Sequence, residues 1–181
     1  MKTNKNDVSL FVDMDGTLVE WRQVPYHELY EKGFFRNGEP YENVVAGLKM
    51  VSDAGENPHT LSAYLADNEH AEEEKNGWLD EHTPYIPAED RLFVPCGTTK
   101  ASFVEKVLGR ALTRKDVLLD DYSMNLHAWE LAGGTGVKLL NGVNGNNGTW
   151  HGPAVSRFST PEDIADYLHR VFDLVSEPAT A

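Results

Sequence analysis

Val8-Ser9-Leu10-Phe11-Val12-Asp13-Met14-Asp15-Gly16-Thr17-Leu18 is the stretch that decides the fold. Its consecutive apolar residues at 10–12 are typical of a strand that is buried on both faces of a parallel sheet. Two carboxylates, Asp13 and Asp15, follow, and Gly16 permits a tight turn close to a ligand. Because open α/β sheets bind ligands outside the carboxyl ends of their strands, we expect both acids to lie where chemistry occurs. The alternative interpretation is a polar turn, in which Asp and Gly serve turn formation only.

The composition describes an ordinary globular chain of 181 residues, with 40% hydrophobic and 25% charged residues. The formal net charge of −13 disfavours nucleic acid polymers and anionic membranes as partners, although a small anionic substrate can bind through a local metal ion or lysine. Cys96 is the only cysteine, so an intrachain disulfide is excluded and a buried thiol is expected. No apolar run reaches the length of a membrane span or a signal-peptide core, which predicts a cytoplasmic protein.

Strand and helix patterns alternate along the rest of the chain. The strands predicted after the first are at 59–65, 91–95, 116–121 and 136–140. The predicted helices are at 26–32, 41–54, 67–81 (capped by Asp67 or Asn68), 98–108 and 160–175. This alternation predicts an α/β fold with three α/β/α layers around a Rossmann-like parallel sheet. We expect the first strand to lie between the strands that end near Ser62 and Asp121.

The spacing of the first two strands predicts an insertion. About 40 residues separate them, which is longer than an ordinary βα crossover. We therefore expect a small helical cap at residues 19–55, inserted over the strand ends of an α/β core formed by residues 1–18 and 56–181. Residues 141–152 are rich in Asn and Gly, which predicts a loop.

Two of the predicted strands end in acid pairs, Asp13/Asp15 and Asp120/Asp121. Neighbouring strands lie about 5 Å apart, so such termini can converge on one cation. Oxygen ligands with room for water and phosphate suit Mg²⁺. One carboxylate of such a set can attack phosphorus, and a second can act as general acid and base. The residues therefore predict phosphoryl transfer and leave open which acid has which role.

Ser62 and Lys100 each stand at a predicted element boundary. Ser62 ends a strand and can bind a phosphate oxygen, whereas Lys100 begins a helix and can neutralise developing charge together with the amino end of that helix. Lys106 competes for the lysine role, but it lies further into the helix. An acid, a hydroxyl, a lysine and a second acid in this order along the chain are a specific signal for phosphoryl transfer. One strand that ends in an acid is a weak signal.

These residues resemble the motifs of the haloacid dehalogenase-like phosphatase superfamily, over residues from about 8 to 145. Residues 11–17 match the first motif, Ser62 the second, Lys100 the third and residues 119–125 the fourth. The resemblance implies that Asp13 is the nucleophile and Asp15 the general acid and base. An acid two residues after the nucleophile implies a phosphatase or phosphomutase; the dehalogenase and P-type ATPase branches lack this pattern.

The resemblance also implies a Mg²⁺ site. Its ligands would be the side chain of Asp13, the backbone carbonyl of Asp15 and one acid of the fourth motif. We favour Asp121 as that acid, because its spacing to Asn125 is similar to that of the motif. Asp120 and Asn125 would then be supporting residues.

Within the superfamily, the chain is similar to the 5′(3′)-deoxyribonucleotidase group. Trp21 after the first motif is similar to the opening of that group, and Lys75-Asn76-Gly77-Trp78 resembles its Lys-x-x-Trp stretch. The chain departs from the group at the second motif, where Ser62-Ala63 replaces a Thr-Ser pair. The resemblance implies a small phosphorylated substrate, a nucleoside monophosphate. The substrate-binding residues that we expect are Gly16, Thr17, Ser62, Ala63, Lys100, Trp21 and Lys75.

Alternatives remain for the substrate and for the secondary residues. An aromatic residue among Trp21, Phe34, Phe35 and Tyr64 can stack on a base, although each alone is typical of core packing. Lysines such as Lys75 are more often solvated than bound to phosphate. A phosphatase of another metabolite, such as a sugar phosphate, needs no stacking surface. A catalytically silent binding protein on the same fold is a third hypothesis, and the presence of every expected catalytic residue argues against it.

Overall fold

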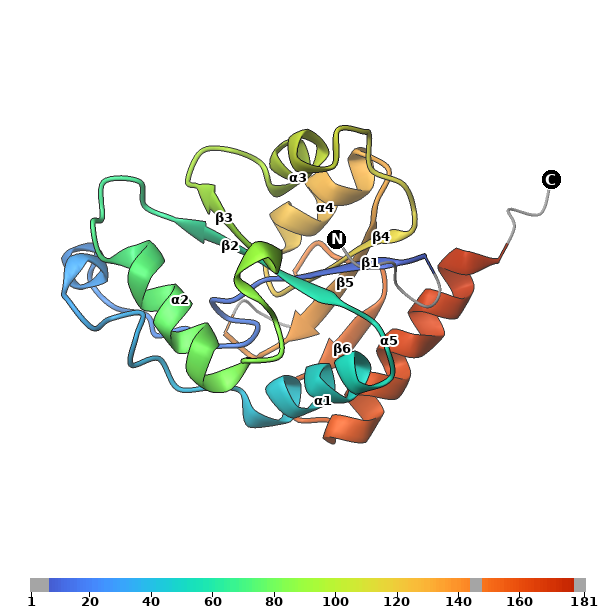
Figure 1. Cartoon of the computed structure of the whole chain (residues 1–181), viewed down its shortest axis with the longest axis horizontal. Coiled ribbons are helices and arrows are strands. Elements are labelled where there is room, and N and C mark those ends of the chain that lie inside the picture. Colours follow the sequence, from blue (N-terminus) through green and yellow to red (C-terminus); the bar gives the residue numbers. More distant parts are fainter. Residues whose placement is uncertain (1–6, 144–147, 178–181) are drawn as a thin grey trace.

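Six parallel strands form one sheet in the computed structural model, which describes residues 7–143 and 148–177 (Figure 1). Their order across the sheet is β3-β2-β1-β4-β5-β6. The strands are β1 Ser9–Val12, β2 Pro58–Tyr64, β3 Arg91–Pro95, β4 Asp116–Asp120, β5 Thr135–Leu140 and β6 Ala154–Ser156. The prediction that the first strand lies between the strands ending near Ser62 and Asp121 is confirmed.

Helices cover both faces of the sheet, as the alternating pattern predicts. The helices are α1 Glu42–Asp53, α2 Ala71–His82, α3 Lys100–Leu108, α4 Ser123–Leu131 and α5 Pro161–Ser176, with the short 3-10 helices η1 Tyr26–Tyr30 and η2 Ala88–Asp90. In Figure 1, α1 and α5 lie on one face and α3 and α4 on the other. Within the described residues, no helix combines the length and the apolarity that crossing a bilayer requires.

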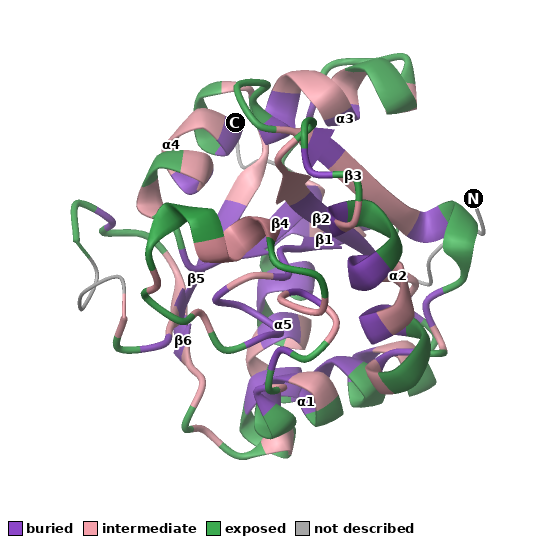
Figure 2. Ribbon diagram, turned by 90° about the vertical axis from the view of Figure 1, so that its left-hand side faces the viewer, coloured by how far each residue is buried: buried purple, intermediate pink, exposed green. Residues whose placement is uncertain are grey.

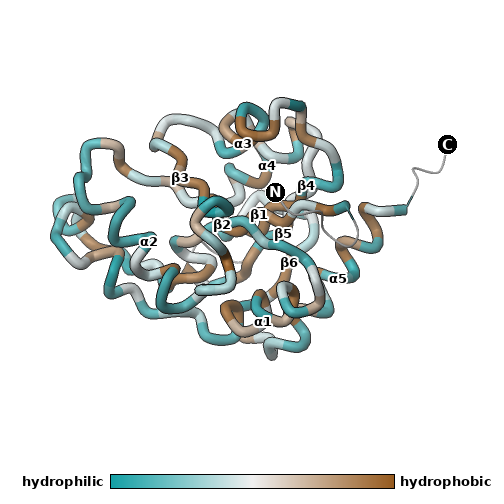
Figure 3. The backbone as a smooth tube through the Cα atoms, viewed as in Figure 1, coloured by the Kyte–Doolittle hydropathy of each residue, from teal (hydrophilic) through white to brown (hydrophobic). Residues whose placement is uncertain are grey.

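The central strands are buried on both faces, which explains their uninterrupted apolar sequence. In β1, Leu10 and Val12 pack with the side chains of α1 and α5, whereas Phe11 packs with those of α3 and α4. The neighbouring strand β4 alternates in register, with Leu118 opposite Phe11. Figure 2 shows these strands as the buried centre, and Figure 3 shows their apolar character. In-register pairing of β1 and β4 brings the carboxyl ends of both strands to the same place on one edge of the sheet.

Several sequence predictions require correction. No element was predicted at α4, which bears apolar residues on its exposed side as well, including Leu131, so its periodicity is obscured. The edge strand β6 was also missed, because three residues carry too little pattern. Helix α2 begins at Ala71 and not at residue 67, since the side chain of Asn68 accepts a hydrogen bond from the backbone N–H of His70 and closes a turn there (3.0 Å). Cys96 is exposed, because it directly follows the edge strand β3.

The segment between β1 and β2 has two parts with different surroundings. The two ends of residues 20–40 meet beside the turn after β1, because the N–H of Glu20 donates to the carbonyl of Glu39 (2.8 Å) and the N–H of Tyr41 donates to the carbonyl of Leu18 (2.8 Å). Helix α1 packs against α5 at Gly47, where an added Cβ would lie 2.9 Å from the carbonyl of Pro161. The cap at residues 19–55 stays a proposal, with residues 20–40 as the part that covers the strand ends. Of the predicted loop at 141–152, residues 144–147 lie outside the described residues.

Replacing Leu119 by Ala tests the packing of the central strand. Leu119 is fully buried in β4, so Leu119→Ala should lower the free energy of unfolding by about 2–5 kcal/mol. The matched control is Leu131→Ala in α4, where the side chain is 91% exposed and the change should stay within about 0.5 kcal/mol. Urea unfolding followed by tryptophan fluorescence measures both, and equal losses would contradict this packing.

Candidate active site

The turn after β1 places Asp13 and Asp15 at the carboxyl edge of the sheet. The N–H of Asp13 still donates to the carbonyl of Leu119 (2.9 Å), so β4 fixes the position of Asp13. Gly16 has a φ of +85°, and a Cβ there would lie 2.4 Å from a carboxylate oxygen of Asp121. Glycine is therefore required both by the backbone angle and by the close approach to Asp121.

Thr17 links the two acid-tipped strands. Its buried hydroxyl donates to a carboxylate oxygen of Asp13 (3.4 Å) and accepts a hydrogen bond from the backbone N–H of Asp121 (3.1 Å). The carboxyl ends of β1 and β4 are therefore held together by side-chain as well as backbone bonds.

Three buried carboxylates lie together at this junction. Asp13, Asp120 and Asp121 each offer an oxygen, and these oxygens lie within 4.8 Å of one another. Burial, together with the charges of Asp13 and Asp120, raises the pKa of Asp121 to about 8. A set of crowded carboxylate oxygens fits a hard divalent cation such as Mg²⁺, which would relieve their repulsion. The cluster is thus suited to bind a metal ion.

Lys100 lies between two of these acids. Its Nζ donates to Oδ1 of Asp13 (2.5 Å) and to Oδ2 of Asp120 (2.6 Å). Burial alone would lower the pKa of Lys100, but the charges of Asp120 and Asp13 outweigh it and raise that pKa. Lys100 begins α3, where the Thr99 side chain accepts a hydrogen bond from the N–H of Ser102 (3.2 Å) and caps the helix. The capped start of α3 therefore positions Lys100, whose ammonium group compensates the charge of Asp13.

Asp120 and Asp121 differ in their surroundings. Besides Lys100, Asp120 accepts hydrogen bonds from the N–H of Tyr122 (2.8 Å) and from the amide of Asn125 (3.0 Å). Burial raises the pKa of Asp120 to about 6, against the effect of Lys100. Asn125 therefore contacts Asp120, although the sequence motif pairs it by spacing with Asp121. Asp120 is occupied by donors of the protein itself.

Asn141 is a site residue that sequence reasoning missed. Its buried side-chain amide donates to the carbonyl of Gly16 (2.7 Å) and to a carboxylate oxygen of Asp121 (2.7 Å). Asn141 directly follows β5, the neighbour of β4, so its position after a strand was the available signal. Its place in an Asn/Gly-rich run had suggested a loop residue only.

Lys75 of α2 is fully buried, so the interpretation as a solvated helix lysine is wrong. Its ammonium group forms an ion pair with Asp15 and donates to Oγ of Ser62 (2.8 Å) and to the carbonyl of Ala63 (2.9 Å). Burial raises the pKa of Asp15, while the charge of Lys75 opposes this shift. The competing Lys106 is exposed in the last turn of α3.

A cavity of about 340 Å³ opens above these acids. Of the predicted site residues, those that line it are Asp13, Asp15, Trp21, Ala63, Lys100, Asp121 and Asn125. The other lining residues are Leu29, Phe35, Tyr64, Leu65, Cys96 and Tyr122. The remaining predicted site residues do not line the cavity but are neighbours of residues that do: Gly16, Thr17, Ser62, Lys75 and Asp120.

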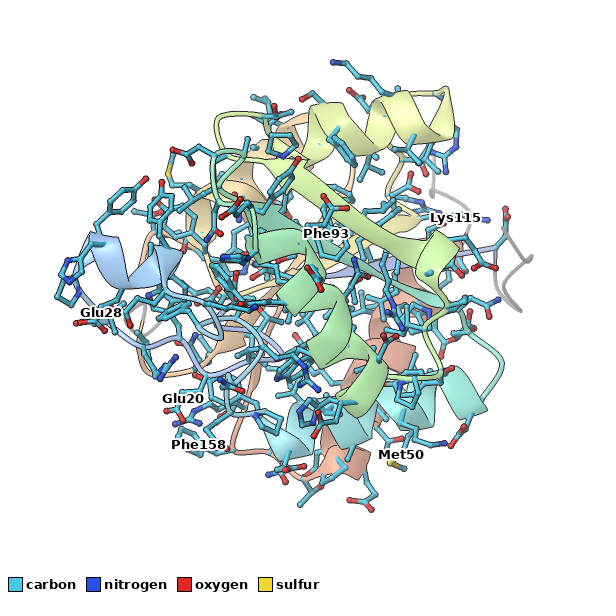
Figure 4. The ribbon with its side chains drawn as sticks, turned by 60° about the vertical axis from the view of Figure 1, so that its left-hand side comes forward. Glu20, Glu28, Met50, Phe93, Lys115 and Phe158 are labelled. Carbon is cyan, nitrogen blue, oxygen red and sulfur yellow. The ribbon has the colours of Figure 1, made fainter. Side chains whose placement is uncertain are left out.

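Residues 20–40, the covering segment, supply one wall of this cavity. Trp21, Leu29 and Phe35 come from it, and Phe34 packs edge-on against both Trp21 (ring centroids 6.5 Å apart) and Phe35 (5.0 Å). In Figure 4, Glu28 marks this end of the molecule and Lys115, which precedes β4, marks the opposite end. The cavity therefore combines charged groups at the strand ends with an aromatic wall from the covering segment.

This arrangement can perform phosphoryl transfer. A carboxylate held by a lysine can attack phosphorus, a second carboxylate two residues later can move a proton, and the acid cluster can hold a divalent cation.

Several solved structures share the fold. D,D-heptose 1.7-bisphosphate phosphatase from B. bronchiseptica, complexed with magnesium and phosphate, is 10% identical with a TM-score of 0.66, covering 90% of this chain and 98% of that chain. A Had-superfamily hydrolase from Ehrlichia chaffeensis is 9% identical with a TM-score of 0.58, and the match covers 94% of this chain and 99% of that chain. The N-terminal part of a Bacteroides fragilis protein, containing a phosphatase domain complexed with Mg, is 17% identical with a TM-score of 0.55, covering 99% and 42%. The fold is that of the haloacid dehalogenase-like hydrolases.

The sequence comparisons identify the family. A search of curated proteins finds no match. The family model of the 5′ nucleotidase, deoxy (Pyrimidine), cytosolic type C proteins matches residues 17–145, which is more than half of the chain. The chain therefore belongs to this family, and it is a phosphohydrolase of the haloacid dehalogenase-like type.

Proposed function

We propose that the protein is a Mg²⁺-dependent phosphomonoesterase that acts on nucleoside monophosphates through an aspartyl-phosphate on Asp13. The observation that carries this proposal is the position of the Asp13 carboxylate. Asp13 directly follows the central strand β1, lines the cavity and accepts a hydrogen bond from the buried ammonium group of Lys100 (2.5 Å). The family match begins at Thr17, so the roles of Asp13 and Asp15 are supported by their contacts and by the resemblance of residues 11–17 to the first motif.

In the first step, a carboxylate oxygen of Asp13 attacks phosphorus and the bond from phosphorus to the ester oxygen breaks. Asp15 donates its proton to the departing alcohol. In the second step, Asp15 takes a proton from water, the water oxygen bonds to phosphorus, and the bond to Asp13 breaks to release phosphate. Lys100 neutralises charge on Asp13 and on the phosphoryl oxygens. Asp15 lines the cavity beside Asp13, as this proton transfer requires.

We propose that Asp13, Asp121 and the backbone carbonyl of Asp15 would hold Mg²⁺. When bound, this ion would neutralise the negative charge of the transferred phosphoryl group. Asp120 is the poorer candidate for a ligand, because it already accepts hydrogen bonds from Lys100, Tyr122 and Asn125. Asp120 would instead hold Lys100 in place.

The aromatic wall favours a nucleotide over a sugar phosphate. Trp21 and Phe35 of this wall line the cavity together with Tyr64 of β2, and an aromatic side chain can stack on a base, whereas a sugar phosphate needs no such surface. The name of the family supports a pyrimidine nucleotide and a cytosolic location, and we propose both for this protein.

Calorimetry tests the metal site. Wild-type protein should bind Mg²⁺, and Asp121→Ala should weaken binding by at least about tenfold, because even outer ligands of metal sites contribute that much. The control is Asp53→Ala, which removes an exposed carboxylate that pairs with Lys49 and should leave Mg²⁺ binding unchanged. Unchanged binding in Asp121→Ala, or none in wild type, would contradict the assignment.

Replacing each acid of the first motif separates their roles. Asp13→Asn should abolish turnover, because an amide is a poor nucleophile. Asp15→Asn should slow hydrolysis by about 10²–10⁴-fold. With an aryl phosphate, whose leaving group needs little protonation, Asp15→Asn should accumulate phosphate on Asp13. Rapid-quench mass spectrometry detects this adduct. Near-normal turnover of Asp13→Asn would instead favour direct attack by water.

A substrate panel tests the nucleotide proposal. Release of phosphate should be fastest from pyrimidine nucleoside monophosphates and slower from sugar phosphates. Trp21→Ala should raise KM for the nucleotide by about 5–150-fold, the loss expected for one stacked base, and should leave KM for an aryl phosphate within threefold. Faster turnover of sugar phosphates would show that another metabolite is the substrate.

A further inference from the structure

Lys75 is a buried cation to which the proposed mechanism assigns no step. Its side chain is fully buried and reaches from α2 to the turn after β1 and to the end of β2. A lysine ammonium has three donors. Asp15, the hydroxyl of Ser62 and the carbonyl of Ala63 accept all three.

This saturation argues against a direct contact between Lys75 and phosphate. Lys75 is also absent from the lining of the cavity, whereas its partners Asp15 and Ala63 belong to it. A phosphate contact would require Lys75 to give up a partner inside the protein. The other buried lysine of the site, Lys100, does line the cavity and suits that role.

The neighbours of Lys75 on α2 hold it in place. The carboxylate of Glu74 accepts hydrogen bonds from the N–H groups of Gly33 (2.5 Å) and Phe35 (3.1 Å). One turn later, the indole N–H of Trp78 donates to the carbonyl of Gly38 (2.7 Å). Both residues bind the segment that covers the cavity, so α2 is anchored on either side of Lys75. The ring of Phe35 lies over the ammonium group, 4.6 Å from Nζ to the ring centroid.

We propose that Lys75 is a positioning residue, which holds the Asp15 carboxylate in the orientation for proton transfer to the leaving group. This inference rests on the proposed function, in which Asp15 is the general acid and base. The ion pair holds one oxygen of Asp15, while the carboxylate still faces the cavity. Displacement of such a group by about 1 Å can slow a reaction by about 10²-fold. Through Glu74 and Phe35, the same helix also determines where the covering segment lies.

Lys75→Met tests the proposal in a single-turnover experiment. The measurement compares release of nucleoside from a pyrimidine nucleoside monophosphate with release of 4-nitrophenol from 4-nitrophenyl phosphate. Lys75→Met should slow nucleoside release by about 10–100-fold, because that leaving group needs a proton from Asp15. Phenol release and both KM values should stay within about threefold. The control Lys106→Met, at an exposed position of α3, should change neither rate.

A second comparison uses the variant Asp15→Asn with and without Lys75→Met. The double variant loses both charges of the ion pair, so it avoids leaving one buried charge alone if Lys75→Met itself unfolds. If Lys75 acts through Asp15, adding Lys75→Met to Asp15→Asn should change nucleoside release and KM by less than about threefold.

The outcomes distinguish the two proposals. Equal slowing of both leaving groups by Lys75→Met, or a rise in KM of tenfold or more when Lys75→Met is added to Asp15→Asn, would overturn the inference and indicate a phosphate contact. If wild-type protein releases neither product, the proposed function fails and the inference fails with it. If wild type releases both and Lys75→Met releases both at the wild-type rate, only the inference fails.

Discussion

The repulsion among three buried carboxylates is the constraint on which the rest of the site depends. Asp13, Asp120 and Asp121 are brought together because β1 and β4 pair in register at the centre of the sheet. Buried charges are costly unless they are paired, and Lys100 compensates two of the three acids from the capped start of α3. Burial, together with the charges of Asp13 and Asp120, raises the pKa of Asp121, and a divalent cation bound to these oxygens would offset that repulsion.

The covering segment and α2 form a second unit, held to the site by polar bonds. The carboxylate of Glu74 accepts hydrogen bonds from backbone N–H groups of the segment, and the indole of Trp78 donates to the carbonyl of Gly38 near its end. Lys75 lies between Glu74 and Trp78 in the helix and forms an ion pair with Asp15. A buried polar group with all of its partners satisfied specifies one arrangement, because any shift of the helix would leave several donors unpaired. Helix α2 thereby contacts both Phe35 of the cavity lining and Asp15, the proposed general acid and base.

Family membership and geometry contribute different parts of the functional argument. The family match and the fold establish a phosphohydrolase, whereas the cavity bears on what it hydrolyses. Charged groups occupy the strand ends, and Trp21, Phe35 and Tyr64 lie around them. This arrangement supports the proposal of a substrate that carries a phosphate and an aromatic base.

The sequence alone predicts whatever depends on local pattern. Consecutive apolar residues at 10–12 and 117–119 indicate strands buried on both faces, and acids directly after them must meet when such strands are neighbours in a parallel sheet. Periodicity does not predict which polar residue of a Glu-rich helix points inward, so the sequence leaves Lys75 between a substrate-binding residue and a solvated helix lysine. Only the tertiary structure decided this, since Asp15, its partner, lies 60 residues away in the chain. The same holds for Asn141, whose role depends on Gly16 and Asp121, because the chain segments that they join are adjacent in space only after the sheet has formed.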